Sequence, residues 1–149
     1  MPQNSKLSGT WNGAELTVIV GVLPLTGLSD GDSVTARRNQ PIYNSRAGND
    51  GAVGRAKVTD KRGQVEVHIM QTSEMNDLLS TTFNLDSLSE EGSFVGPLIV
   101  KDLSGRTVIS AGDAWLMQVG DVAFASGEVG ERVYTFEAAD LVMVLGGNS

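Results

Sequence analysis

Eight residues, Gln64-Val65-Glu66-Val67-His68-Ile69-Met70-Gln71, begin the segment that sets the architecture of this chain, and the segment extends to Thr107. Apolar and polar side chains alternate through these eight positions. Val65, Val67 and Ile69 would share one face of a strand, and the polar side chains would share the other. This alternation is typical of an antiparallel strand with one face on the core and one in water.

The period of the sequence changes after Gln71. Met75, Leu78, Leu79 and Phe83 are spaced as one apolar stripe of a helix, which we expect from about Ser73 to Asn84. Thr72 or Ser73 can cap its first turn, and Glu74 suits the positive end of the helix dipole. A strand from Phe94 to Val100, a turn at Leu103-Ser104-Gly105-Arg106 and a strand from Thr107 to Ser110 follow. Strand, helix, strand, turn and strand therefore form the central unit.

The rest of the chain adds strands on both sides of this unit, within a single domain of residues 1–149. Lys61-Arg62-Gly63 is expected to join two strands as a short hairpin loop. Residues 1–13 are polar and glycine-containing, so we expect an N-terminal arm that folds only against something else. The total is eight or nine strands and one helix: a mainly β fold, either an antiparallel sandwich or a partly closed barrel with a flanking helix. The further strands are expected at Glu15–Val22, Ser33–Arg38, Arg55–Asp60, Ala114–Gln118, Arg132–Ala138 and Leu141–Leu145.

Residues 39–54 show no periodic pattern, and their glycine, asparagine and serine content predicts a loop. A loop of this length within a compact domain is uncommon and is usually functional or disordered. Ile42 and Tyr43 would gain little in a fully solvated loop. We interpret them as contacts with another subunit; the alternative is that they pack on the domain's own surface.

The formal charge of −7 argues against nucleic-acid binding as the main activity, and the absence of cysteine excludes disulfides and thiolate metal sites. No secretory leader or membrane-spanning run is recognisable, so we expect a soluble protein made in the cytoplasm. Charge is uneven: seven basic residues and two acids lie in residues 37–62, whereas twelve acids and three basic residues lie in residues 74–149. The two regions are either separate solvated faces or surfaces that fit a second copy, positive to negative.

No arrangement of residues predicts catalysis or metal binding. His68 is the single histidine and has no Gly-x-Ser-x-Gly nucleophile elbow to serve. Asp30 and Asp32 have the spacing of part of a calcium loop but lack its later ligands. Glu90-Glu91 would point apart in a loop, with nothing apolar to raise a pKa. Trp115 is interpreted as a core residue. No enzyme activity and no cofactor are expected.

Several segments resemble the tail tube proteins of contractile-tailed phages. These segments are Gln71-Thr72-Ser73, Asn76-Asp77-Leu78-Leu79-Ser80, Phe94, Pro97-Leu98-Ile99-Val100-Lys101-Asp102-Leu103-Ser104-Gly105-Arg106-Thr107 and Ala114-Trp115. The resemblance covers roughly residues 33–117 and continues more weakly through residues 132–145. It implies a tail-tube-type β-sandwich or partly closed barrel with one flanking helix. It also implies six copies in a ring and rings stacked into a tube that conducts phage DNA into the host.

The resemblance also implies sites and partners. The long loop of such proteins contacts the next ring, which assigns an inter-ring contact to Pro41, Ile42, Tyr43, Asn44, Arg46 and Arg55, and Glu66 is placed in the lumen. The partners would be the tail sheath protein, a tape-measure protein, and baseplate and tail terminator proteins, in the tail of the virion. Two alternatives stay open: the inner tube of a contractile bacteriocin or secretion system, and a monomeric ligand-binding β-module that uses Trp11 and Trp115.

Overall fold

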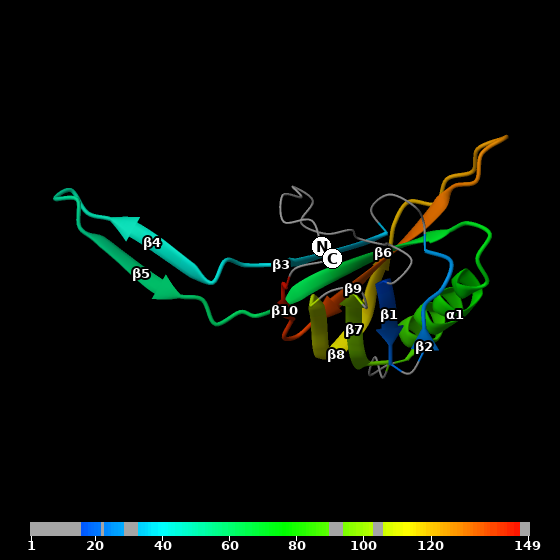
Figure 1. The fold of residues 1–149 in the computed structure, drawn as a ribbon, viewed down its shortest axis with the longest axis horizontal. Coiled ribbons are helices and arrows are strands. Elements are labelled where there is room, and N and C mark those ends of the chain that lie inside the picture. The colour runs from blue at the N-terminus through cyan, green and yellow to red at the C-terminus, as the bar shows by residue number, and fades with distance from the viewer. Residues whose placement is uncertain (1–15, 22, 29–32, 90–93, 103–105, 147–149) are drawn as a thin grey trace, which may run out of the picture.

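The computed structural model describes residues 16–21, 23–28, 33–89, 94–102 and 106–146. Within them lie ten strands and one helix (Figure 1). The elements in chain order are β1 Leu16–Val20, β2 Leu23–Pro24, β3 Val34–Arg38, β4 Tyr43–Ala47, β5 Val53–Lys57, β6 Gly63–Met70, α1 Met75–Leu88, β7 Gly96–Asp102, β8 Val108–Val119, β9 Glu131–Ala138 and β10 Val142–Val144.

Eight of the strands form one antiparallel sheet in the order β2-β1-β7-β8-β9-β6-β3, with β10 paired to β8 beside this path. The long strand β8 changes neighbours along its length. Its first part pairs with β7 and β10, and its second part, from Ala114 onward, pairs with β9. The sheet curls into a half-barrel with α1 on its flank (Figure 1). The expected mainly β, partly closed antiparallel barrel with one helix is therefore confirmed.

The core lies between the helix and one face of the curled sheet. On β6, Val65, Val67 and Ile69 are fully or almost fully buried while their neighbours are half-buried, as the alternation predicted. Leu98 and Val100 of β7 join them, and Tyr134 and Phe136 of β9 add the largest side chains. Burying apolar surface of this kind is the main favourable term in folding. The same alternation leaves a second, more polar face of the sheet on the side away from the core.

The helix is held at its start by side chains near the β6–α1 turn. The N-cap residue is Glu74, without a side-chain cap bond, so the expected cap at Thr72 or Ser73 was wrong. The Ser73 hydroxyl still accepts the amide of Met75, in the first turn, at 3.2 Å. The Asn76 side chain donates to the carbonyl of Met70 at 2.9 Å and accepts the Tyr134 hydroxyl at 2.8 Å. These bonds join β6, α1 and β9 at one point. The helix extends further than expected, to Leu88.

Three sequence-based expectations about strands were wrong. Residues 39–54 are not a patternless loop, because they contain β4, the connecting turn and the start of β5, which pair in a two-stranded ribbon. Lys61-Arg62-Gly63 does not close a hairpin, because β6 pairs with β3 and β9 and leaves β5 to β4. The strands expected at 107–110 and 114–118 are one continuous strand, β8. In each case the partner strand is distant in sequence or the strand has no buried face, so local patterns could not identify the pairing.

Candidate assembly interface

A hairpin arm, residues 42–58, projects from the body along the longest axis of the molecule (Figure 1). Its two strands pair in register from Tyr43 opposite Lys57 to Ala47 opposite Val53. The amide of Val58 donates to the carbonyl of Ile42 at 2.8 Å and closes the base of the ribbon. Every strand residue of the arm is exposed. A two-stranded ribbon alone is only marginally stable in water, and the strand residues of this arm bury no face against the body.

A four-residue turn forms the tip of the arm. The amide of Gly48 donates to the carbonyl of Ala52 at 2.8 Å, and the carboxylate of Asp50 accepts the amide of Ala52 at 3.0 Å. Gly51 has a φ of 87°, a left-handed conformation that favours glycine. The turn therefore fixes the register of the ribbon.

The two faces of the arm differ in chemistry. One face carries Tyr43, with the guanidinium carbon of Arg55 4.3 Å from the centre of its ring, a cation–π contact. The other face has a shallow depression of about 380 Å³ where Gly54 has no side chain and Asn44 and Arg46 form the sides. A flat cationic ribbon with one aromatic anchor suits a protein surface that is acidic and partly apolar.

All six residues predicted for the inter-ring contact lie together here. Tyr43, Asn44, Arg46 and Arg55 are on β4 and β5, and the remaining two immediately precede β4. Each is exposed; they are Pro41, Ile42, Tyr43, Asn44, Arg46 and Arg55. The sequence thus predicted residues of one projecting segment, on both of its faces, but it did not predict that the segment is a β-ribbon.

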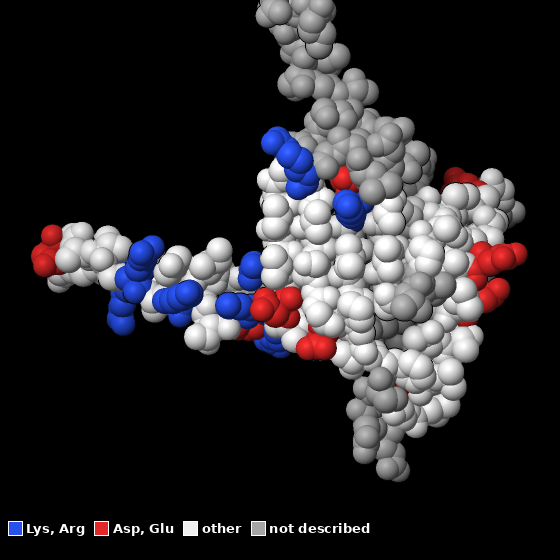
Figure 2. Space-filling model, turned by 60° about the horizontal axis from the view of Figure 1, so that its bottom comes forward, with Lys and Arg blue, Asp and Glu red and all other residues white. Residues whose placement is uncertain are grey.

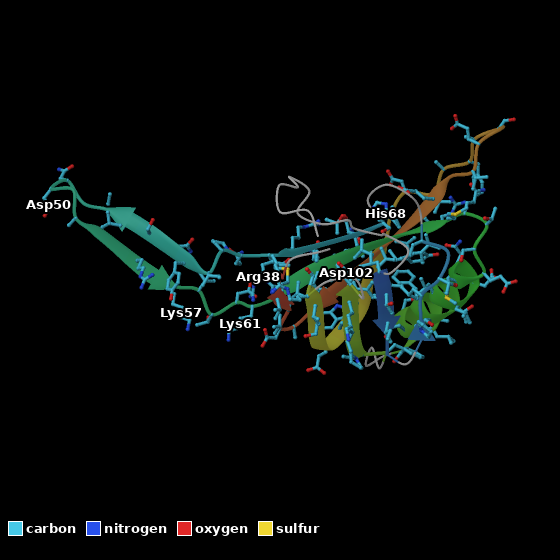
Figure 3. The ribbon with its side chains drawn as sticks, viewed as in Figure 1. Arg38, Asp50, Lys57, Lys61, His68 and Asp102 are labelled. Atoms are coloured by element: carbon cyan, nitrogen blue, oxygen red, sulfur yellow. The ribbon has the colours of Figure 1, made fainter. Side chains whose placement is uncertain are left out.

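Further cations surround the arm where it joins the body. Figure 3 labels Arg38 and Lys61 at this junction, Lys57 on the arm and Asp50 at the tip. Figure 2 shows Lys and Arg side chains along the arm and at its base. Arg62 forms an ion pair with Asp60 at 2.9 Å, and this hydrogen-bonded guanidinium lowers the pKa of the Asp60 carboxyl. The arm and its junction are therefore the basic end of the molecule.

Glu66 lies on the polar face of the sheet, opposite the core, and it is half-buried on β6. Its carboxylate is 3.6 Å from the guanidinium of Arg37, which also donates to Gln64 at 2.7 Å. His68, on the same face, has Nδ1 2.8 Å from the Glu131 carboxylate. The structure thus gives Glu66 a position on a polar sheet surface, and its assignment to a lumen stays a prediction.

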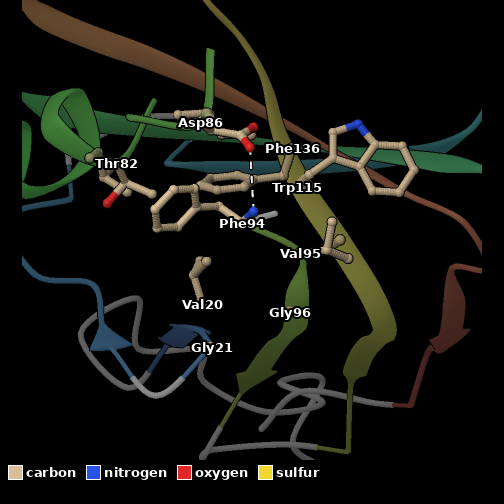
Figure 4. A pocket seen from close by; sticks show the side chains of 12 residues that line it. Val20, Gly21, Thr82, Asp86, Phe94, Val95, Gly96, Trp115 and Phe136 are labelled. Atoms are coloured by element: carbon tan, nitrogen blue, oxygen red, sulfur yellow. Dashed lines mark hydrogen bonds between the residues drawn. The ribbon is translucent and has the colours of Figure 1, made fainter. Parts of the chain in front are cut away.

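A mostly apolar cavity of about 330 Å³ lies between α1, β1 and the start of β7 (Figure 4). Phe94 and Phe136 form part of its wall, and the Phe94 amide donates to Asp86 at 3.3 Å. Trp115 turns its indole away from these two rings (Figure 4). Trp115 is half-buried and pairs with Glu137 across the sheet, so the expectation of a core tryptophan was wrong. The buried positions beside it belong to Ala114 and Leu116.

The described residues contain no group of three or more His, Cys, Asp or Glu side chains that could hold a metal ion. Asp30, Asp32, Glu90, Glu91 and Trp11 lie outside the described residues. Nor does the part of the chain that the structure describes have a helix both long and apolar enough to cross a membrane.

The described residues therefore form a curled β-sheet body with a projecting arm. Comparisons with known proteins find the same fold in solved structures. No protein-family model matches the chain. The chain is 26% identical to Structural protein ORF10 of Pseudomonas phage KPP10 over 126 aligned residues. The alignment covers 83% of this chain and 71% of that protein.

Solved structures with the same fold come from contractile injection systems. A chain of the anti-feeding prophage cap, the AFP tube terminating cap, matches with a TM-score of 0.64 at 7% identity and 95% coverage of both chains. A chain of the PVC sheath-tube complex in the extended state matches with a TM-score of 0.62 at 9% identity and 93% coverage of both. The PVC sheath/tube terminator gives 0.61 at 10% identity, covering 93% of this chain and 99% of that one.

These similarities agree with the resemblance to phage tail tube proteins. The chain is similar to a phage structural protein and has the fold of contractile-system tube and terminator chains. Similarity to a phage structural protein agrees with a place in a virion, and the fold agrees with that of chains from contractile injection systems. The phage relative favours a non-enzymatic role.

Proposed function

We propose that this protein is the tail tube subunit of a contractile-tailed phage. Six copies close into a ring, rings stack through the arms, and the stacked rings enclose a lumen through which DNA passes to the host. The observation that carries this proposal is the arm: an ordered, fully exposed ribbon that contributes nothing to its own core. Such an element is explained by a partner, and a contact between two different surfaces of identical copies propagates or closes into a ring.

The polar face of the curled sheet supports the lumen assignment. Glu66, which pairs with Thr135, and Glu137, which pairs with Gln64 and Trp115, lie on this face away from the core. DNA carries one negative charge per roughly 1.7 Å of its axis, so a wall with carboxylates would let it pass without binding. The DNA is a transiting cargo in this proposal and is not a specific ligand.

The partners follow from the same assembly. The tube subunit would contact the sheath protein on the outside, a tape-measure protein in the lumen during assembly, and baseplate and terminator proteins at the two ends. The similarity to chains of a sheath-tube complex and a sheath/tube terminator supports association with such tail components. The inner tube of a bacteriocin or secretion device remains the alternative with the same fold, and it differs only in having no genome to conduct.

A tube terminator or cap is a second candidate function, because chains of that kind share this fold. The two functions predict different assemblies. A tube subunit forms rings that stack without limit, whereas a terminator forms a ring that stacks on one face only.

Negative-stain electron microscopy and sedimentation of the purified protein test the proposal. Hollow tubes whose length grows with protein concentration would support a tube subunit. Single rings at every concentration would favour the terminator, and a monomer at every concentration would favour the ligand-binding module and overturn the proposal.

A further inference from the structure

The end of the body opposite the arm is acidic. This acidic end, residues 71–77 and 120–132, comprises the turn into α1 and the loop between β8 and β9 (Figure 1). One cation, Arg132, lies in these two segments. Its guanidinium is directed to its own loop, 5.1 Å from the ring of Phe124. In Figure 2 the charged side chains on the side of the body away from the arm are acidic. Five exposed acids belong to the acidic end: Glu74, Asp77, Asp121, Glu128 and Glu131.

Backbone hydrogen bonds hold the two segments of the acidic end together. The amide of Gln71 donates to the carbonyl of Gly130 at 2.9 Å, and the amide of Gly130 donates to the Gln71 side-chain oxygen at 3.0 Å. At the other end of the loop, the amide of Gly120 donates to the carbonyl of Val133 at 2.8 Å. The loop is therefore anchored at both ends in the single subunit. A surface that is already ordered loses less entropy when a partner binds.

The acidic end also exposes large apolar side chains, as the arm does. Phe124 is 80% exposed, and Val122 and Val129 of the same loop are also exposed. On the arm, Tyr43 and Val53 are the exposed counterparts. Apolar groups rimmed by charge on a protruding segment are typical of protein contact surfaces. The two ends are therefore complementary both in charge and in apolar content.

We infer that the arm of one copy docks on the acidic end of a second copy. This inference rests on the proposed function and names the surface that receives the arm. Arg55 and Lys57 of the first copy, which share one face of the arm with Tyr43, would face Asp121 and Glu128 of the next. Because the two surfaces are different and lie at opposite ends of the long axis, the contact is head-to-tail and propagates.

Electrostatics favour this pairing over the other available ones. Two arms repel each other, and so do two acidic ends, so only the arm-to-acidic-end orientation is attractive. The polar face of the sheet is a weaker receptor, because Glu66 already lies 3.6 Å from Arg37 within the same subunit. The contact would therefore also give the growing assembly its polarity.

A charge-exchange experiment tests the inference. The arm variant Arg55→Glu/Lys57→Glu and the loop variant Asp121→Lys/Glu128→Lys each replace attraction by repulsion. An exposed pair contributes up to about fivefold in association, so each double variant should raise the concentration for half-assembly roughly ten- to a hundredfold in about 0.1 M salt. In about 1 M salt the Debye length is near 3 Å, and the difference should largely disappear. Pelleting measures the assembled fraction, and circular dichroism checks that each variant is folded.

The decisive sample combines the arm and loop variants in one chain. Combined, the reversed arm meets a reversed acidic end, and assembly should return to within about fivefold of the wild type. The matched control joins the arm variant to Asp113→Lys/Asp140→Lys, two exposed acids outside the acidic end. This control restores the same net charge and should not restore assembly.

The outcomes separate the inference from the proposed function. Wild-type tubes with no recovery in the combined variant, or equal recovery in the control, would overturn the inference and leave the tube function standing. A wild-type chain that stays monomeric at every concentration would overturn both.

Discussion

Removing the arm should separate folding from assembly. The change replaces the 17 residues 42–58 with a turn of about four residues between Pro41 and Thr59. No strand residue of the arm is buried, so the core loses no apolar contact. Loop closure becomes easier by about two doublings of length at ~0.6 kcal/mol each, so the free energy of unfolding should rise by about 1 kcal/mol. The amide of Asn39 and the carbonyl of Arg62, 3.0 Å apart, hold the new ends at the correct separation.

Urea denaturation followed by circular dichroism measures the stability of this variant, and sedimentation with electron microscopy measures its assembly. We expect a folded subunit that forms no stacked rings. The matched control is Asp50→Asn, which keeps an oxygen acceptor for the Ala52 amide at the arm tip and should assemble. A variant that loses about 3 kcal/mol or more would refute the claim that the arm is independent of the core. Normal tubes would refute its role in stacking. Deleting residues 41–51 alone is a poorer test, since it leaves β5 as an unpaired, aggregation-prone edge.

Three further predictions concern the body and are measured by urea denaturation in the arm-deleted background, where self-association adds nothing to stability. Gly63→Ala should lower the free energy of unfolding by about 1–3 kcal/mol. The added methyl group would lie 2.7 Å from the Leu141 Cβ. In the control, Gly112→Ala, the added methyl group meets no atom within 4 Å. Equal losses of stability in the two variants would show that the contact with Leu141 is not the cause. Ile69→Ala should lower it by about 2–5 kcal/mol because the side chain is fully buried, and a loss under about 1 kcal/mol would place it outside the core. Tyr134→Phe should lower it by about 1 kcal/mol through loss of the 2.8 Å bond to Asn76. Burial raises the pKa of the Tyr134 hydroxyl. The stability that Tyr134 contributes is therefore present below pH about 10 and is lost as the pH rises further. The variant should lack this loss of stability at alkaline pH, and identical pH profiles of the two proteins would contradict the role given to Tyr134.

The central unit could be predicted from sequence because its periodicity reports burial. The apolar positions of β6 are the buried ones. Of the predicted helix stripe, Met75, Leu79 and Phe83 pack on the core, whereas Leu78 is 47% exposed. Where one face is buried and the other is wet, the side-chain pattern determines the element. The mainly β class with one flanking helix followed from these elements, whereas the tail-tube type came from the resemblance to phage tail tube proteins.

Most of the arm escaped prediction because both of its faces are solvated, and the strand expected at Arg55–Asp60 overlaps only the end of β5. Without a buried side, β4 and β5 carry no apolar alternation, and the exposed Val53 is surrounded by small or charged residues. A signal did exist in the Gly48-Asn49-Asp50-Gly51 turn between two short segments with few helix formers. The sheet order was also beyond sequence reasoning, because β6 pairs with β3 and β9 across long separations. The predicted lumen position of Glu66 and the inter-ring role of the arm residues depend on other copies, which a single chain does not contain.

The full exposure of the two arm strands has an evolutionary consequence. Substitutions in β4 and β5 should change the free energy of unfolding of the isolated subunit little, since every residue of these two strands is exposed. Selection on solubility or half-life would leave this segment unconstrained, and only the fitness of the finished particle would restrict it. Related proteins could therefore change which subunit the arm binds, or how tightly it binds, without compensating substitutions in the core of the sheet.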